Sequence, residues 1–215
     1  MTVPFSSEQF FSVFGRYNLA VWPAQIVLYA LGMLVIGFAA RGTRRSSMWA
    51  SSILAALWLW SAVVYHLTFF RVINPIAAVF AAAFFLQAAL VFRLGVLRSD
   101  LVFAGSTGSR RIAGGIIVAY ALIVYPFLNF ALGHGYPRMP TFGLPCPTTI
   151  FTFGILLFAA PNVPRAVFVI PALWAVVGTA AALTFGLRED FGLPVAGVVS
   201  IALILARPRT VETRD

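Results

Sequence analysis

The sequence predicts an all-α protein, a polytopic membrane bundle of about seven transmembrane helices. Hydrophobic residues make up 61% of the 215 positions and charged residues only 10%, against about 25% charged in soluble domains. The mean hydropathy of +0.95 leaves too little polar surface to cover a globule in water. Long apolar runs follow one another along the chain, as spanning helices require, and the alternating ten-residue strands of a membrane barrel are absent.

Seven apolar runs are the expected spans: Ala20–Ala40, Met48–Phe70, Ile76–Leu94, Ile112–Leu132, Thr148–Ala160, Ala166–Phe185 and Leu193–Ala206. The breaks between them carry charges, Gly or Pro, as helix ends in a membrane should. With seven spans, 11 of the 15 arginines fall on one side and 4 on the other. Because basic loops stay in the cytoplasm, we expect the N-terminus outside and the C-terminus inside. Residues 20–206 then form the bundle and 207–215 a cytoplasmic tail.

Residues 1–19 are expected to be an amphipathic segment on the outer surface. Ser6 followed by Gln9 three residues later is typical of a capping box at a helix start. The aromatic residues after them would face lipid or the bundle. Two roles stay open for this segment, an anchoring helix and a lid over an outer pocket.

The uncommon polar residues gather on the outer side in this topology, and they are the candidate lining of a cavity there: Tyr65, His66, His134, Tyr136, Cys146, Thr148, Thr149 and Asp190. Asp190 and its neighbour Glu189 lie in a short break between two spans. We expect both to be solvated loop charges, with attraction of a cation as the second interpretation.

The loop from Gly133 to Pro147 is rich in Pro and Gly and contains the single cysteine of the chain. The run that follows it has thirteen residues, about 20 Å of helix, against a hydrocarbon core of about 30 Å. The simplest solution is a loop that dips into the bundle, so that the helix starts below the membrane surface. Pro147 suits the first helical position, which makes Cys146 the expected N-cap. A packed apolar cysteine, a reactive or ligand-binding thiol and an intermolecular partner all stay open for it.

The cofactor is unknown from sequence. His66, His134 and Cys146 are the candidate metal ligands, although their spacings match no compact zinc motif. The two histidines also suit haem as axial ligands, but no pairing is fixed by the sequence. Nucleotide-binding loops and hydrolase motifs of soluble enzymes are missing.

Four stretches carry a resemblance to a known family: "RYNLAVWPAQ", "VVYHLTFF", "INP" and above all "PTFGLPCPTTIFTFG". In these the chain resembles a family of uncharacterised bacterial multi-pass integral membrane proteins, a domain of unknown function whose members are sometimes labelled permeases. The resemblance covers nearly the whole chain. It implies a membrane fold in the bacterial cytoplasmic membrane, and it supplies no catalytic residues.

The expected function is therefore that of a membrane protein whose outer-side cavity binds or passes a small solute, as a permease does. A non-catalytic membrane subunit of a larger redox or transport complex, and an outer-side thiol- or metal-dependent enzyme, stay open as alternatives; we expect the protein not to be an enzyme. The expected partners are the lipid bilayer, a small-molecule solute and other membrane proteins. Nucleic acid is excluded because the arginines punctuate apolar runs and form no continuous basic face.

Overall fold

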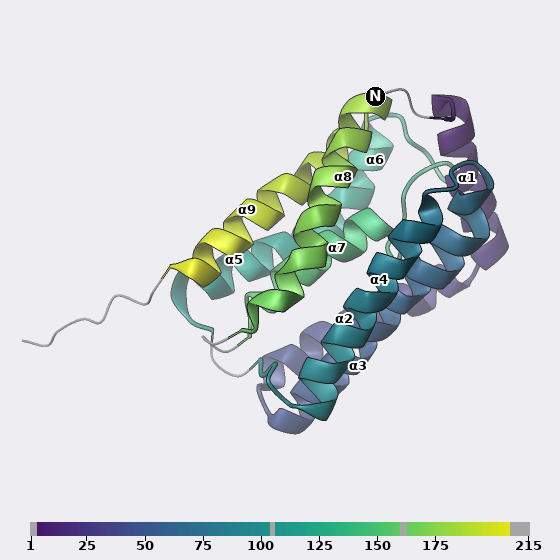
Figure 1. Ribbon diagram of the computed structural model, residues 1–215. Coiled ribbons are helices and arrows are strands. Elements are labelled where there is room, and N and C mark those ends of the chain that lie inside the picture. The colour runs from purple at the N-terminus through teal and green to yellow at the C-terminus, as the bar shows by residue number, and fades with distance from the viewer. Residues whose placement is uncertain (1–3, 104–105, 160–162, 207–215) are drawn as a thin grey trace, which may run out of the picture.

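The computed structural model describes residues 4–103, 106–159 and 163–206, and the chain it shows is all-α (Figure 1). The α-helices are α1 (Ser7–Val21), α2 (Ala24–Arg41), α3 (Arg44–Trp60), α4 (Ala77–Phe92), α5 (Gly108–Ala119), α6 (Tyr125–Ala131), α7 (Pro145–Leu156), α8 (Val169–Phe185) and α9 (Gly192–Leu205). Three π-helical segments continue α3, α4 and α5: η1 (Ser61–Phe69), η3 (Arg93–Leu97) and η4 (Tyr120–Val124). Three 3-10 turns complete the set: η2 (Phe70–Val72), η5 (Arg165–Phe168) and η6 (Arg188–Phe191).

Each of the seven apolar runs predicted from sequence contains a helix, although the run Thr148–Ala160 is helical only as far as Leu156 and its last residue lies outside the described residues. In the described part of the chain, five continuous helices are long and apolar enough to cross a membrane: Ala24–Arg41, Arg44–Val72, Ala77–Leu97, Gly108–Ala131 and Arg165–Phe185. The helices α7 and α9 are shorter, with 12 and 14 residues. The predicted tail 207–215 lies outside the described residues.

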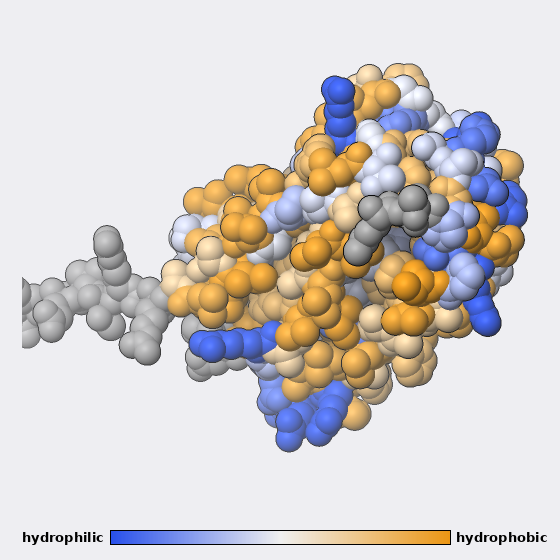
Figure 2. All heavy atoms as spheres, turned by 45° about the horizontal axis from the view of Figure 1, so that its top comes forward, coloured by the Kyte–Doolittle hydropathy of each residue, from blue (hydrophilic) through white to orange (hydrophobic). Residues whose placement is uncertain are grey.

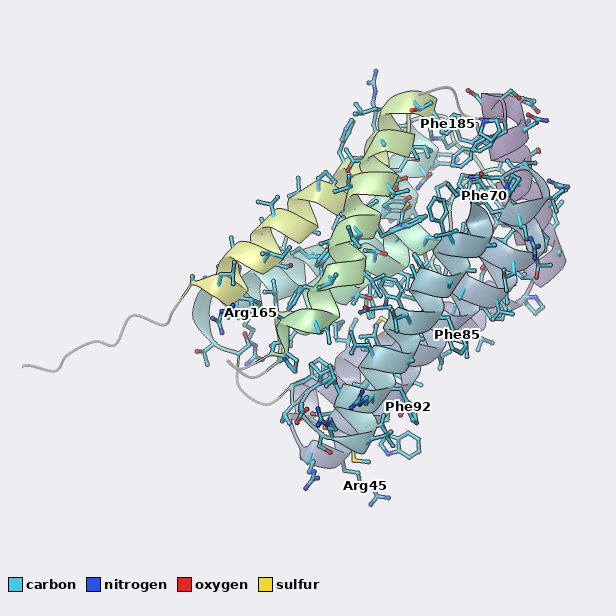
Figure 3. All side chains as sticks on the ribbon, viewed as in Figure 1. Arg45, Phe70, Phe85, Phe92, Arg165 and Phe185 are labelled. Atoms are coloured by element: carbon cyan, nitrogen blue, oxygen red, sulfur yellow. The ribbon has the colours of Figure 1, made fainter. Side chains whose placement is uncertain are left out.

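The outer surface of the bundle is apolar. Phe85 and Phe92 point away from α4 (Figure 3) and are 58% and 43% exposed. Figure 2 shows residues of high hydropathy over most of the visible face, with hydrophilic residues in separate groups towards its margins. Exposed apolar surface on this scale is what a lipid environment requires, since in water it would drive aggregation. Together with the five long apolar helices, this surface indicates a membrane protein.

The helix α7 lies at the centre of the bundle, between α5, α8 and α9, and also touches α3 (Figure 1). Every described residue of α7 is buried except Cys146. A helix that is apolar all round belongs inside a protein or a membrane. Small residues let α7 pack closely against its neighbours. A Cβ placed on Gly114 of α5 would lie only 2.9 Å from the carbonyl oxygen of Gly154 in α7. Such small-residue contacts are typical of helix packing in membranes.

The helix α1 packs across one end of the bundle, which we call the α1 end. Ser6 and Gln9 form the predicted capping box. Phe10 stacks on Phe185 of α8 at a centroid distance of 4.4 Å and meets Phe70 of η2 edge-on at 6.1 Å. Phe70 and Phe185 mark this end in Figure 3, while Arg45 and Arg165 lie at the opposite end, which we call the arginine end.

The loop before α7 enters the bundle, as its length and composition predict. Its last residues, 140–144, are all buried. The ring of Phe142 packs against Tyr29 of α2 and Phe151 of α7, with centroid distances of 5.3 and 5.2 Å. Gly143 has a φ of +98°, a backbone conformation that favours glycine. Its carbonyl accepts a hydrogen bond from the Ser61 hydroxyl at 2.8 Å.

Asn18 of α1 holds the first half of this loop in place. Its side-chain amide donates to the carbonyl oxygens of Pro137 and Met139 at 2.6 and 2.8 Å. Its side-chain oxygen accepts from the Thr141 hydroxyl at 2.8 Å. The amphipathic segment is thus fastened to the loop by buried polar contacts, which fixes the position of both at the α1 end.

Candidate functional site

The turn η6 between α8 and α9 places two neighbouring carboxyl groups inside the protein. Glu189 is 0% exposed and Asp190 is 2% exposed. The expectation of solvated loop charges is therefore wrong. Short charged breaks between apolar runs usually lie in water, but here the turn folds back onto η4 and α6. The Tyr125 hydroxyl donates to the Asp190 carboxylate at 2.6 Å, and the Tyr120 hydroxyl donates to the main-chain oxygen of Glu189 at 2.6 Å.

Cys146 lies beside this acidic turn. Its thiol neighbours the Asp190 carboxyl and the Trp174 indole of α8. Helix α7 begins at Pro145 with Leu144 as its N-cap, so the prediction that Cys146 is the N-cap is wrong by two residues. Both prolines fit inside the first turn because the N–H groups there have no acceptor within the helix. The cysteine consequently points sideways into the bundle from the first turn.

Tyr65 and His66 come from the π-helical segment η1 and lie on the other side of this site. Tyr65 is buried close to Cys146 and Asp190. His66 is 0% exposed and is surrounded by aromatic rings, including Phe84 at 4.8 Å and Trp174 at 5.2 Å between centroids. Neither of its ring nitrogens has a hydrogen-bond partner among the described residues. π-helical segments often occur at functional sites.

His134 reaches the site from the loop after α6. Its Nδ1 lies 3.1 Å from Oε1 of Glu189, and its side chain is 21% exposed. The ring of Phe11 in α1 covers it at a centroid distance of 5.0 Å. The second carboxyl oxygen of Glu189, Oε2, has no partner among the described residues. One buried carboxyl oxygen of the turn is thus left without a hydrogen-bond partner in the described part of the chain.

These groups form what we call the buried acidic cluster: Tyr120, Tyr125, His134, Cys146, Glu189 and Asp190. Of the predicted lining residues, His134, Cys146 and Asp190 belong to it, and Tyr65 and His66 flank it. Tyr136 does not, because it is 51% exposed and its hydroxyl donates to the carbonyl oxygen of Asn18 at 3.3 Å.

The two threonines at the start of α7 are buried, and neither hydroxyl bonds to the acidic turn. The Thr149 hydroxyl donates to the carbonyl oxygen of Pro145 within its own helix at 2.7 Å. Thr148 is 0% exposed, and its hydroxyl has no partner among the described residues. Neither is shown in contact with the acidic turn.

The predicted metal ligands are not brought together. Within the described residues, no group of three His, Cys, Asp or Glu side chains is placed to hold a metal ion. His134 contacts Glu189, whereas His66 lies within its aromatic surroundings. The groups that meet at the acidic turn are therefore carboxyl, hydroxyl and thiol groups and the imidazole of His134.

The electrostatics of the cluster favour a bound proton on Asp190. Burial raises the pKa of this carboxyl from 3.8 to about 7, and the negative charge of Glu189 adds to the rise. The hydrogen bond from Tyr125 and the contact with Cys146 lower the pKa and offset part of that effect. A carboxyl group in this range changes its charge near neutral pH, which is a property of functional acids and bases.

Sequence reasoning missed four residues of this region: Tyr120, Tyr125, Trp174 and Glu189. The three aromatic residues lie within predicted spans, and Glu189 was expected to be a solvated charge. The sequence did contain one signal, a pair of acidic residues in a chain with six in total. Carboxylates that rare in a membrane protein are functional candidates by default.

One family model matches the chain over nearly its whole length. Residues 7–215 match the model of a family of unknown function, DUF6064. Since this match covers nearly the whole chain, the protein belongs to that family. The chain has no significant match among the curated proteins or among the solved structures.

Proposed function

We propose that this DUF6064 protein binds a small solute at the buried acidic cluster and passes it in the manner of a permease, and that the solute is a small organic cation that competes with a proton. One observation carries the proposal. Glu189 and Asp190 are side by side and almost fully buried, and Oε2 of Glu189 lacks a partner among the described residues. Buried charges in proteins are paired or bind a ligand, because an isolated one is costly.

The surroundings of the two carboxyl groups suit a cation. Tyr65, Tyr120 and Tyr125 bring aromatic rings to the turn, and rings of this kind attract organic cations. Among the described residues, the basic side chain that contacts these carboxyl groups is His134, whose ring lies against Oε1 of Glu189. An anionic solute would meet two carboxyl groups and is disfavoured.

The proposed topology has seven crossings, with the cluster on the outer side of a bacterial cytoplasmic membrane. The excess of 11 arginines over 4 supports this orientation. It also supports α1 as a surface helix that covers the site from outside, since Phe11 lies over His134. The same segment then acts both as anchor and as cover.

The orientation is tested with single cysteines in a Cys146→Ser background. Ser109 at the arginine end and Gly135 at the α1 end are both exposed. A membrane-impermeant maleimide added to intact cells should label Gly135→Cys and leave Ser109→Cys unlabelled. The reverse pattern would overturn the orientation and the outer position of the site.

Binding is tested by thermal unfolding of the purified protein with choline or putrescine, against acetate and glycerol as matched controls. The cations should stabilise the protein at pH 8, and the apparent affinity should fall by up to tenfold per pH unit below about pH 7, as the proton takes their place. Glu189→Gln and Asp190→Asn should abolish the effect. Asp100→Asn is the control, because Asp100 is exposed and outside the site.

Equal responses to cations, acetate and glycerol would refute the cation-binding function. If, in addition, the protein were isolated with a stoichiometric membrane partner, the alternative of a non-catalytic subunit would be favoured. Uptake of the stabilising cation into proteoliposomes, with and without a pH gradient, then separates passage from binding alone.

A further inference from the structure

A groove opens on the surface of the bundle between the start of α8 and the end of α9, away from the buried acidic cluster. Its volume is about 220 Å³. Six of its seven lining residues are apolar, and the seventh is a cation: Phe168, Val169, Ala172, Ile201, Ile204, Leu205 and Arg165. A space of this size lined by apolar side chains offers water too few polar partners to be a good site for it.

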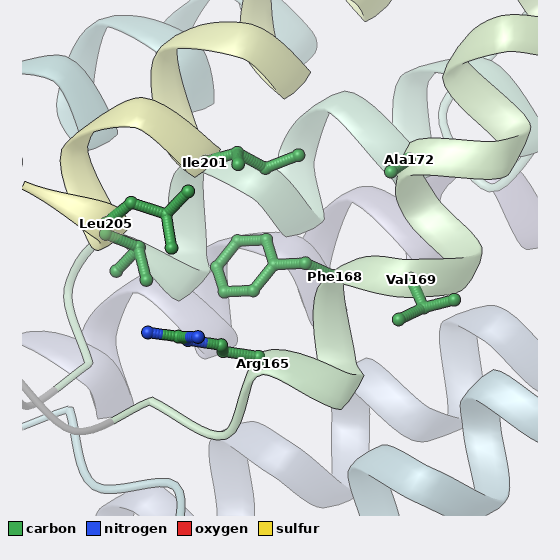
Figure 4. A pocket seen from close by; sticks show the side chains of 7 residues that line it. Arg165, Phe168, Val169, Ala172, Ile201 and Leu205 are labelled. Atoms are coloured by element: carbon green, nitrogen blue, oxygen red, sulfur yellow. The ribbon is translucent and has the colours of Figure 1, made fainter.

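Arg165 is the first residue of a continuous span, Arg165–Phe185, at the arginine end. It is exposed and makes no ion pair with any described residue. Figure 4 shows its side chain beneath the ring of Phe168, with the guanidinium group turned towards Leu205. The charge therefore lies at one end of the groove, and the apolar lining extends from it along α8 towards Ala172.

The nearby Arg110 differs, because its guanidinium is already used. Its Nε donates to the carbonyl oxygen of Leu203 and its Nη2 to that of Ala206, both at 3.0 Å. Arg110 thus satisfies carbonyl groups at the end of α9. Arg165 remains as the cation that faces outwards beside the groove.

We infer that this groove is a binding site for an anionic phospholipid, with the phosphate on Arg165 and part of one acyl chain between α8 and α9. Three features carry the assignment. The ligand must be amphiphilic, because the lining has one charged end and an apolar body. Its head must be negative, since Arg binds phosphate oxygens through paired N–H groups. The groove is long enough for a segment of an acyl chain, because the helix from Arg165 to Ala172 is about 10 Å long.

The position in the membrane agrees with this assignment. The arginine end is the cytoplasmic one in the proposed topology, and basic pockets between transmembrane helices on that side bind anionic headgroups. The inference does not depend on the solute bound at the α1 end, since no residue is shared between the two sites.

The experiment is native mass spectrometry of the purified full chain with added phosphatidylglycerol or phosphatidylcholine of the same acyl chains. The wild type should retain phosphatidylglycerol about fivefold more strongly, the effect of about one basic residue near a membrane surface. Arg165→Gln should remove the preference. Arg111→Gln is the matched control, because Arg111 is exposed at the same end but does not line the groove.

The acyl chain is tested separately. Ala172→Phe fills the groove and should reduce retention of both lipids, whereas Leu173→Phe, on the neighbouring exposed position of α8, should not. Unfolding temperatures of all four variants show whether each is folded. Equal retention of the two lipids by the wild type, or an equal loss in Arg165→Gln and Arg111→Gln, would overturn the assignment. Stabilisation by inorganic phosphate alone, dependent on Arg165 and unaffected by Ala172→Phe, would replace the lipid with a free anion.

Discussion

Replacing Asp190 by Asn should remove most of the pH dependence of stability from this protein. The pKa of Asp190 is raised by burial from 3.8 to about 7, with Glu189 adding to the rise. The folded state therefore holds the proton more tightly than the unfolded state. Stability should be greatest below about pH 4, fall as the pH rises from 4 to 7, and change little above 7. The groups that face Asp190 are Glu189, Tyr125 and Cys146.

The size of the effect follows from the pKa difference. Each unit corresponds to about 1.4 kcal/mol, so the change from 3.8 to about 7 gives roughly 4 kcal/mol between the two ends of the range. In a chain of this length, 1 kcal/mol shifts the unfolding temperature by about 2–4 °C. The unfolding temperature of the wild type should thus fall by on the order of 10 °C between pH 4.5 and pH 8.

In Asp190→Asn the side-chain oxygen can still accept the hydrogen bond from the Tyr125 hydroxyl. The amide does not titrate in this pH range. Its unfolding temperature, followed by tryptophan fluorescence in detergent, should exceed that of the wild type at pH 8 and vary much less with pH. Asp100→Asn, at an exposed position, should follow the wild type throughout. If the unfolding temperature of Asp190→Asn fell with pH as steeply as that of the wild type, the Asp190 carboxyl would not be the titrating group.

Two further substitutions test the packing. Gly154→Ala should lower the free energy of unfolding by about 1–3 kcal/mol, because the added Cβ would lie 3.0 Å from the carbonyl oxygen of Gly114. The control Gly115→Ala has open space around it and should be nearly neutral in the same thermal assay. Equal losses of stability in the two variants would contradict the close contact. Asn18→Leu should lower the free energy of unfolding by about 2–5 kcal/mol, because it leaves two loop carbonyls and a threonine hydroxyl unpaired. Ser12→Ala, at a half-buried position of the same helix, should change little. Proteolysis in the loop from 133 to 144 should increase in Asn18→Leu and not in Ser12→Ala.

Much of this architecture is predictable from sequence because lipid imposes a simple requirement. Helices have to be long and apolar, so the seven runs stand out, and the capping box at Ser6 is a local pattern. The entry of the loop into the bundle is also predictable, because the run after it is too short to begin at the membrane surface. These features depend on composition and on neighbours within a few residues.

The candidate site is only partly predictable, for a physical reason. Whether Asp190 is solvated depends on Tyr125, which is 65 residues away along the chain. No periodicity or spacing indicates that contact. The start of α7 was misplaced because Pro145 and Pro147 are both acceptable at a first helical position, and only the backbone shows that both lie within the first turn. The aromatic surroundings of His66 come from several distant segments, which its position in the sequence does not reveal.

The enclosure of α7, in which every residue except Cys146 is buried, has a consequence for how the protein is assembled. Its 12 residues amount to about 18 Å of helix, less than the hydrocarbon core of about 30 Å, and it has no face for lipid. Long helices such as α2 and α4 gain free energy by entering the bilayer one at a time, whereas α7 gains its stability only from neighbours that are already in place. In the two-stage description of membrane protein folding, α7 therefore belongs to the second stage, helix association. Cys146 and the groups around it acquire their arrangement only at that step, so the site is completed last.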